Sequence, residues 1–582
     1  MLDRPLARSL PVLDLLPAAP SPDGARLPPD PADTRLTEYR PDAPALPRFH
    51  VWTLGCQMNR SDSEEMAGRL LSAGCAEARS LEDADLIVIN TCAIREAAEA
   101  KVIGRQGALG RLKAANPALR IVMTGCSVRA SNRDSLARRY PAIDVFLRPD
   151  EEPELVDRLG LASAQGAIGL AGPGGHSQPV GRTTIVGRAE VSDASALGAT
   201  RRAAVAGGAV ARGSAISAWL PIVYGCDKTC TYCIVPFSRG PERSRPFDDV
   251  VEEARSLAAA GYREVTLLGQ NVNSYGHDLP AEARFGHVDA ERWAGRRLDL
   301  HGRPDLAELI RAIDGLRSAD GVPAIPRLRF VTSHPWDLSD RLIAAMADCP
   351  SVCEALHLPV QSGDDAMLRR MGRQYTREHY LERLAAIRSA IPDIAISTDV
   401  IVGFCGETEA QFESTLALLE TVRYDQVFAA AYSERPGTPA TRLADDVPAP
   451  EKRRRLNELL RVQESIGETR NRAWLGREVE VLVDTIVPRP EHDHDEGSDE
   501  ATDEARARLR VGDGEVHLSG RTRQNKLVHL AGSVHLVGSL ARVLIDHAGP
   551  YSMRGVLRPI VRGPNVAAPA ASLVPLRSAP GA

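Results

Sequence analysis

Three cysteines near the middle of the chain have the type and spacing that metal chemistry needs. Cys226, Cys230 and Cys233 form a C-x3-C-x2-C pattern in the segment GCDKTCTYC. Three thiolates on one loop can hold three irons of a four-iron cluster, which leaves the fourth iron open for catalysis. A structural zinc site is the alternative, but such sites normally have four protein ligands, and no suitable fourth Cys or His is nearby in the sequence. The pattern therefore predicts a catalytic iron–sulfur cluster.

Three further cysteines, Cys56, Cys92 and Cys126, are far apart in sequence but occupy equivalent positions. Each follows the end of a predicted strand and precedes a predicted helix. The carboxyl ends of parallel strands lie along one edge of a sheet, and a helix N-terminus favours a thiolate. Three unrelated buried cysteines are the alternative, since free cysteine is often buried. Their equivalent placement predicts a second cluster with one open iron.

The elements that carry this second set are three strand–loop–helix units in residues 48–161. Their strands are FHVWTLG, DLIVIN and RIVMTG, and their helices include SDSEEMAGRLLSAG and REAAEAKVIG. Regular alternation of strand and helix indicates a parallel sheet covered by helices. We therefore expect a doubly wound parallel α/β domain.

A second alternating series, in residues 216–447, carries the first set. Its six predicted strands are WLPIVYG, EVTLLGQNV, RLRFVTS, ALHLPVQ, IAISTDVIVGF and QVFAAAYS. Six units are short of the eight of a full TIM barrel, so we expect a partial, open (β/α)6 barrel. The Cys226 loop follows the first strand and so lies at the C-terminal mouth, where barrel active sites form.

The rest of the chain is predicted to be a small β-barrel and several irregular segments. Residues 448–563 begin with a charged helix and continue with short strands, which indicates the barrel. An acidic insertion at 488–504 interrupts it, and a further insertion at 277–300 has no predicted role. We expect a disordered Pro-rich leader, a flexible Ala- and Gly-rich linker and a disordered tail. These three segments are residues 1–47, 162–215 and 564–582.

The composition is that of a globular protein, with 582 residues of which 43% are apolar and 25% charged. Ten cysteines are too few for a disulfide scaffold in so long a chain. No apolar run approaches the ~18 residues of a membrane helix, so we expect a cytoplasmic protein without a membrane partner. The net charge of −6 argues weakly against binding of nucleic acid. The region from residue 505 onward is basic, however, with eleven Lys and Arg and only three acidic residues.

Several long motifs in order resemble one family between residues 48 and 563. The cysteine loop resembles that of the radical-SAM superfamily, in which the open iron binds S-adenosylmethionine (SAM) and a 5′-deoxyadenosyl radical is formed. TLGCQMNRSDSE, INTCAIREAAE and MTGC resemble the N-terminal domain of the methylthiotransferases. GCDKTCTYCIVPFSRGPERSR, LLGQNVNSYG, HLPVQSG, STDVIVGF and YSERPGTPA resemble the core of that family. GRTRQNKLVH resembles its C-terminal RNA-binding barrel, called TRAM.

This resemblance implies a substrate. Gln57, Met58 and Asn59 follow the first cysteine and resemble the branch that acts on isopentenylated adenosine. The implied reaction adds a methylthio group to C2 of N6-isopentenyladenosine at position 37, beside the tRNA anticodon. Alternatives are a methylthiotransferase for threonylcarbamoyladenosine or for a ribosomal protein, and, from another class, a non-catalytic iron–sulfur RNA-binding protein.

The resemblance also implies cofactors and partners. The cofactors are two [4Fe–4S] clusters and SAM, which acts as radical source and methyl donor. A radical suits the reaction because the C2–H of adenine is neither acidic nor electrophilic. In this hypothesis the Cys226 cluster reduces SAM, and the cluster on Cys56, Cys92 and Cys126 carries the sulfur. The partners are the tRNA anticodon stem-loop and an electron donor of the flavodoxin or ferredoxin class, and the protein is expected to be a monomer.

Polar residues elsewhere are candidates for ligand contacts. Four of them follow or lie in later barrel strands and are candidates for binding SAM, with structural polarity as the alternative: Gln270, Ser333, Gln361 and Asp399. Six basic residues are candidates for RNA or substrate contacts, with a solvated surface as the alternative: Arg239, Arg243, Arg245, Arg521, Arg523 and Lys526. Cys75, Cys349 and Cys353 are expected to be packing residues. Cys405 stands where the family usually has proline.

Overall fold

The computed structural model describes residues 47–93, 96–161, 210–285, 292–293, 296–297, 301–487 and 514–558. Nearly all of the predicted leader, linker, acidic insertion and tail lie outside these residues, as does part of the 277–300 insertion. Within the described residues, no helix is both long and apolar enough to cross a membrane.

The N-terminal domain is a five-stranded parallel sheet in the order β2-β1-β3-β4-β5. Its strands are β1 (Arg48–Thr53), β2 (Ala76–Glu77), β3 (Leu86–Thr91), β4 (Arg120–Gly125) and β5 (Val145–Phe146). Its helices are α1 (Gln57–Ser72), α2 (Glu96–Ala115), α3 (Arg133–Arg139), η1 (Glu152–Glu154) and α4 (Leu155–Arg158).

Helices cover both faces of this sheet. In β3, Leu86 and Val88 pack with residues of α1 and α4, whereas Ile87 and Ile89 pack with residues of α2 and α3. Burial of both faces explains why β3 is an uninterrupted apolar run rather than an alternating one. The expected doubly wound parallel domain is confirmed.

The central domain contains six parallel strands in two linked three-stranded sheets, β12-β9-β6 and β13-β14-β15. These are β6 (Ser217–Pro221), β9 (Glu264–Leu268), β12 (Arg327–Phe330), β13 (Ala355–His357), β14 (Ala395–Val402) and β15 (Gln426–Ala431). The sheets join where the Leu328 N–H donates to the Ser351 carbonyl (2.7 Å) and the Cys353 N–H donates to the Leu328 carbonyl (2.9 Å). The partial (β/α)6 barrel is therefore confirmed.

Helices and short elements surround these strands. The helices are α7 (Phe247–Ala259), α8 (Leu306–Asp314), α9 (Asp340–Asp348), α10 (Asp365–Arg370), α11 (Arg377–Ala390) and α12 (Glu409–Val422). The short elements are β7 (Val223–Tyr224), α6 (Val235–Ser238), β8 (Arg243–Ser244), η3 (Val272–Ser274), β10 (Arg292–Trp293), β11 (Arg296–Arg297), η4 (Pro335–Asp337) and η5 (Pro439–Arg442). Five of these helices (α8, α9, α10, α11 and α12) begin at a side chain that accepts a hydrogen bond from the first turn, namely Asp305, Ser339, Asp364, Thr376 and Thr408.

The C-terminal domain is a closed barrel in the order β16-β17-β18-β20-β19, as expected. Helix α13 (Ala449–Arg472) leads into it. The other elements are β16 (Glu478–Ile486), β17 (Val516–Thr522), β18 (Leu527–Gly532), η6 (Val534–Leu536), β19 (Leu540–Ala548) and β20 (Met553–Leu557). Its core is small and aliphatic, centred on Val481, Val483, Leu518 and Val528.

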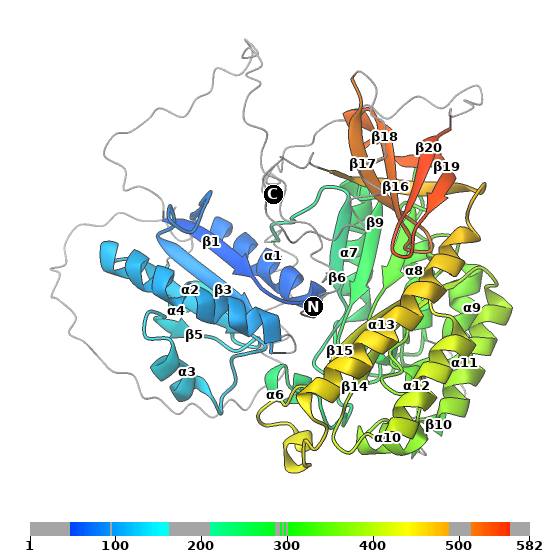
Figure 1. The fold of residues 1–582 in the computed structure, drawn as a ribbon. Coiled ribbons are helices and arrows are strands. Elements are labelled where there is room, and N and C mark those ends of the chain that lie inside the picture. Colours follow the sequence, from blue (N-terminus) through cyan, green and yellow to red (C-terminus); the bar gives the residue numbers. More distant parts are fainter. Residues whose placement is uncertain are drawn as a thin grey trace, which may run out of the picture.

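The two outer domains contact different parts of the central barrel (Figure 1). Helix α1 packs on the side of β6, where the Tyr224 hydroxyl donates to Glu65 (3.3 Å). The C-terminal barrel sits at the amino ends of the strands, where Arg327 at the start of β12 donates to the Arg521 carbonyl (2.7 Å). The cysteine loop between β7 and α6 lies at the opposite, carboxyl end.

Candidate functional site

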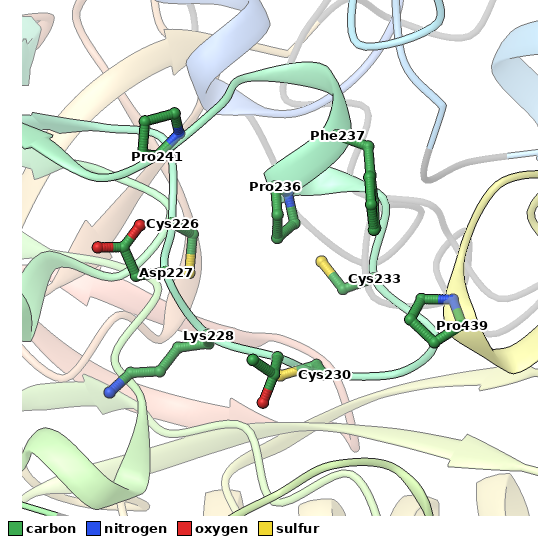
Figure 2. Close-up of a pocket in the computed structure, with 10 residues that line it drawn as sticks. Cys226, Asp227, Lys228, Cys230, Cys233, Pro236, Phe237, Pro241 and Pro439 are labelled. Carbon is green, nitrogen blue, oxygen red and sulfur yellow. The ribbon is translucent and has the colours of Figure 1, made fainter. Parts of the chain in front are cut away.

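The Cys226 loop surrounds a cavity of about 510 Å³. Residues from the loop, from α6, from the segment between α6 and β8 and from the start of η5 line it: Cys226, Asp227, Lys228, Thr229, Cys230, Cys233, Pro236, Phe237, Pro241 and Pro439. Figure 2 shows the sulfur atoms of Cys226 and Cys233 directed into this opening, whereas the Lys228 ammonium points away. The structure thus brings the three cysteines of the first predicted site around one space.

Backbone contacts fix the shape of the loop. Gly225 has φ +74°, and a Cβ there would lie 2.0 Å from the Pro241 carbonyl oxygen, so only glycine fits before Cys226. The Cys226 N–H donates to the Gly240 carbonyl (3.2 Å). Farther along, the Thr231 N–H donates to the Met371 carbonyl (2.8 Å). The loop is therefore held at both ends.

The chemistry of the donors fits an iron–sulfur cluster. Cys226 and Cys230 are buried, and burial raises the pKa of Cys226 and of Cys233 to about 12. A coordinating metal replaces the proton of a thiol, which relieves the cost of a buried bare thiolate. Buried thiols around a cavity are therefore suited to holding a cluster.

The second predicted set also converges. Cys56 is the N-cap residue of α1, Cys92 directly follows β3, and Cys126 directly follows β4. A Cβ on Gly55 would lie 2.8 Å from the Cβ of Cys92, so the chain before Cys56 touches Cys92. Because β1 and β3 adjoin where the strand order reverses, Cys56 and Cys92 lie at the switch point, where such sheets bind ligands, and Cys126 follows the neighbouring strand β4.

The two sites are neighbours, because Arg239, which follows the Cys226 loop and α6, donates to the Cys126 sulfur (3.2 Å). Burial raises the pKa of Cys126, and the neighbouring Cys56 thiol raises it further. Burial also raises the pKa of Cys233, and both Cys230 and Cys126 add to that rise. Cys126 therefore lies close enough to the first site to interact with it electrostatically. Within the described part of the chain, no three His, Cys, Asp or Glu side chains are arranged to hold a single metal ion.

Two of the basic residues after the loop are not at the surface. Arg239 is 5% exposed; its Nη2 donates to Asp62 (2.6 Å) and its Nε to the Cys126 sulfur (3.2 Å). Arg245 donates to Glu253 (2.8 Å) and to the Pro221 carbonyl (2.9 Å). The guanidinium groups of Arg239 and Arg245 are thus committed to internal partners, which corrects their interpretation as phosphate contacts. Arg243 lies in β8 and is half-buried.

The basic turn between β17 and β18 docks the C-terminal barrel onto the central domain. Arg523 pairs with Glu354 (2.9 Å) and also donates to the Pro350 carbonyl (2.9 Å). Lys526 is buried and pairs with Asp425 (2.7 Å). For Arg523 and Lys526 the expectation of RNA contacts is therefore corrected to contacts between domains. Arg521 remains a candidate for RNA.

Removing a buried arginine of this junction should destabilise the protein. Arg329 donates to Glu264 (2.8 Å) and to the carbonyls of Thr522 (2.8 Å) and Arg523 (2.9 Å). Arg329→Met would leave one carboxylate and two carbonyl groups without their hydrogen-bond donor. We therefore expect a loss of about 3 kcal/mol in the free energy of unfolding, measured in urea. Arg311→Met breaks an exposed pair with Asp348 and should cost less than about 1 kcal/mol. Equal losses in the two variants would contradict this role.

The four candidate SAM contacts gather at the carboxyl side of the barrel strands. Gln270, Ser333 and Gln361 follow β9, β12 and β13, and Asp399 lies within β14. The Gln270 Oε1 and the Ser333 hydroxyl are buried and meet no hydrogen-bond partner among the described residues. Gln361 has φ +72°, and its N–H donates to the Asp399 carbonyl (2.9 Å). Such buried polar atoms require a partner, and a bound ligand can supply one here.

A buried polar group beside the cysteine loop had no signal in the sequence. Lys228 pairs with Asp337 (2.9 Å), and the side-chain amide of Asn271 donates to the same carboxylate. The Ser274 hydroxyl donates to Glu242 (2.5 Å). Burial raises the pKa of Asp337 to about 6 and that of Glu242 to about 8. Spacing could not reveal this group, because its members come from four separate segments.

Glu242 should make stability depend on pH. The folded protein holds the Glu242 proton more tightly than the unfolded chain, because the folded-state pKa lies above the ordinary 4.5. The contribution of this proton to the free energy of unfolding is therefore complete below about pH 4.5 and is lost as the pH rises through about 8. Glu242→Gln can still accept from Ser274 and has no proton to lose. We expect its urea midpoint, in the metal-free chain, to fall less than that of the unsubstituted chain as the pH is raised. The exposed Glu413→Gln is the control, and a parallel pH profile in all three proteins would contradict the assignment.

Packing explains the other cysteines. Cys349 lies in the main core of the central domain and Cys75 in the core on one face of the N-terminal sheet. Cys353 is buried close to Arg329, which lowers its pKa while burial, the larger effect, raises it. Cys405, in place of the family's usual proline, packs with Phe404 and Tyr432.

Comparison with known proteins agrees with this architecture. Residues 220–419 match the model of the Radical SAM superfamily, and residues 48–148 match that of the Uncharacterized protein family UPF0004. The chain is thus a radical-SAM protein with a second cysteine-bearing domain.

The tRNA-2-methylthio-N(6)-dimethylallyladenosine synthase of Roseiflexus sp. (strain RS-1) is 39% identical over 531 residues, which cover 90% of this chain and 93% of that protein. The synthase of Carboxydothermus hydrogenoformans is 40% identical over 510 residues, covering 88% and 99%. This chain belongs to the tRNA-2-methylthio-N(6)-dimethylallyladenosine synthase family.

Solved structures show a more distant likeness. The radical S-adenosylmethionine methyltransferase TsrM from Kitasatospora setae, with tryptophan and a SAM analogue bound, aligns with a TM-score of 0.43 at 14% identity. The alignment covers 66% of this chain and 72% of that one.

Proposed function

We propose that this chain transfers a methylthio group to C2 of N6-isopentenyladenosine in tRNA by radical-SAM chemistry. The observation that carries this proposal is the near-full-length likeness to synthases of that name, together with two neighbouring three-cysteine sites that Arg239 links through its contact with Cys126. A radical enzyme suits the target, because the C2–H of adenine resists acid–base activation.

Each cysteine set has one role. Cys226, Cys230 and Cys233 hold the cluster that binds SAM, and the second set, Cys56, Cys92 and Cys126, holds the auxiliary cluster. When bound, these groups supply the electron for SAM cleavage and the sulfur for transfer. Four of the six cysteines are buried, which limits the water that would otherwise compete for the open irons and quench reactive species: Cys92, Cys126, Cys226 and Cys230.

Neighbouring residues orient the substrates. Gln270 and Ser333 present unpartnered polar atoms, and with Gln361 and Asp399 they form the proposed SAM site. Phe237, 54% exposed at the rim of the cavity, offers a ring on which the target base can stack. Binding of the base there would place it beside the Cys226 loop.

The partners follow from the reaction. The RNA substrate is the anticodon stem-loop of tRNA, with Arg243 and Arg521 as candidate phosphate contacts. An electron donor of the flavodoxin or ferredoxin class is required because SAM cleavage consumes an electron. We infer that the protein acts as a monomer in the cytoplasm, where its tRNA substrate is found.

Mass spectrometry of tRNA nucleosides tests the proposal. The chain is expressed in a host that lacks its own methylthiotransferase, and an empty vector is the control. We expect 2-methylthio-N6-isopentenyladenosine to appear while its unmethylthiolated precursor falls. A methylthio group on threonylcarbamoyladenosine instead would overturn the substrate. No changed nucleoside from a protein loaded with both clusters would favour a ribosomal protein as the target.

A further inference from the structure

One cysteine in each site is contacted by a buried arginine. Arg239 follows α6 in the central domain, but both of its charged contacts are in the N-terminal domain. Its Nε donates to the Cys126 sulfur (3.2 Å), and its Nη2 donates to Asp62 (2.6 Å), whose side chain is 0% exposed. The guanidinium thus reaches from one domain to a cysteine of the other domain's site.

Arg373 has the corresponding position at the other site. It follows α10 and is 7% exposed. Its Nη1 lies 3.5 Å from the Cys230 sulfur, its Nε donates to the Tyr375 hydroxyl (2.9 Å), and its Nη2 donates to the Pro359 carbonyl (2.7 Å). These two fixed contacts hold one edge of the guanidinium against Cys230. Neither arginine has a place in the SAM or RNA contacts described above.

A guanidinium beside a cluster sulfur has a defined physical effect. Arginine stays protonated in proteins, so its charge at the site is constant. Reduction adds a negative charge to the cluster, and a buried positive donor on a ligand sulfur stabilises that charge. The reduction potential is therefore higher with the arginine than without it. Outer hydrogen bonds of this kind tune metal sites.

We propose that Arg239 and Arg373 are positioning residues that set the reduction potentials of the two clusters separately. Arg239 raises the potential of the auxiliary cluster on Cys56, Cys92 and Cys126, and Arg373 raises that of the cluster on Cys226, Cys230 and Cys233. The inference rests on the proposed function only through the two clusters and not through the RNA substrate.

The position of Arg239 has a further consequence. Its donor reaches Cys126 only while the central and N-terminal domains are docked, because the arginine and the cysteine come from different domains. The potential of the auxiliary cluster is thus coupled to the contact between domains. Asp62 holds the guanidinium in place for this contact.

Redox titration followed by electron paramagnetic resonance tests the proposal on the full-length protein. One background carries Ala at Cys226, Cys230 and Cys233, so that only the auxiliary cluster is bound. The other background carries Ala at the second set. Arg239→Gln and Arg239→Lys are made in the first background, and Arg373→Gln and Arg373→Lys in the second. No tRNA is needed, so this test is independent of the methylthiolation assay.

We expect each Gln variant to shift the potential of its adjacent cluster to a more negative value, with a smaller shift for Lys. Arg239→Lys keeps a positive charge beside Asp62 and should therefore fold even if Arg239→Gln does not. In that case the shift in potential of the Lys variant tests the proposal. The control is Arg245→Lys in both backgrounds, because Arg245 is a half-buried arginine of the same segment whose guanidinium donates to Glu253 and to the Pro221 carbonyl. Unchanged potentials in loaded variants, or equal shifts in the Arg245 control, would overturn the inference. If the potentials shift as expected but the unsubstituted chain forms no methylthiolated nucleoside, only the proposed function is overturned.

Discussion

Replacing any one of six cysteines with alanine is expected to abolish methylthiolation of tRNA. Those cysteines are Cys56, Cys92, Cys126, Cys226, Cys230 and Cys233. Each of the two sites has three thiols and leaves one iron open, so the loss of a ligand leaves a second iron without a protein ligand. We expect product to fall below detection in the nucleoside assay, a change of at least about a thousandfold if the two sites act as one unit.

Iron content separates the two sites in these variants. The unsubstituted chain should bind about eight irons, and a variant that loses one cluster about four. The matched controls are Cys75→Ala for the N-terminal domain and Cys349→Ala for the central domain, because both cysteines are buried packing residues. Full activity in any of the six variants would remove that cysteine from its site. Loss of activity in the two controls would point to a general effect of losing a buried thiol.

The architecture was predictable because its signals are local. Strands such as LIVINT in β3 are short apolar runs followed by helices, and their order along the chain implies a parallel sheet. Once the strands are placed, their carboxyl ends place Cys56, Cys92 and Cys126 at one edge. The doubly wound domain, the six-unit barrel and the small β-barrel were all predicted in this way.

The partners of the basic residues were not predictable, because they depend on contacts between distant segments. Arg239 and Asp62 are 177 residues apart, and Arg523 and Glu354 are 169 residues apart. Composition cannot distinguish an arginine that will be ion-paired in a domain junction from one that faces solvent. The resemblance of GRTRQNKLVH to an RNA-binding barrel pointed to the right domain but not to the role of Arg523 and Lys526 in docking it.

A second large loss of activity is expected when the glycine directly before Cys226 or Cys126 is replaced. Gly225 has φ +74° and Gly125 has φ +90°. A Cβ at these positions would lie 2.0 Å from the Pro241 carbonyl oxygen and 2.1 Å from the Thr91 carbonyl oxygen. Backbone atoms cannot move aside as a side chain can, so alanine at either position must displace the cysteine that follows it. We expect Gly225→Ala and Gly125→Ala each to lose one cluster and all methylthiolation.

Two other glycines isolate the effect of the clash from that of backbone strain. Gly240 has φ +76° and Gly74 has φ +85°, yet a Cβ at either would meet nothing within 4 Å. Gly240→Ala and Gly74→Ala should therefore cost only the left-handed strain of about 1 kcal/mol and keep about eight irons. Gly225→Ala and Gly125→Ala should keep about four, because only the adjacent site is displaced. If Gly225→Ala bound as much iron as Gly240→Ala, the loop would be able to shift without losing its cluster, and the close approach to Pro241 would not be what positions Cys226.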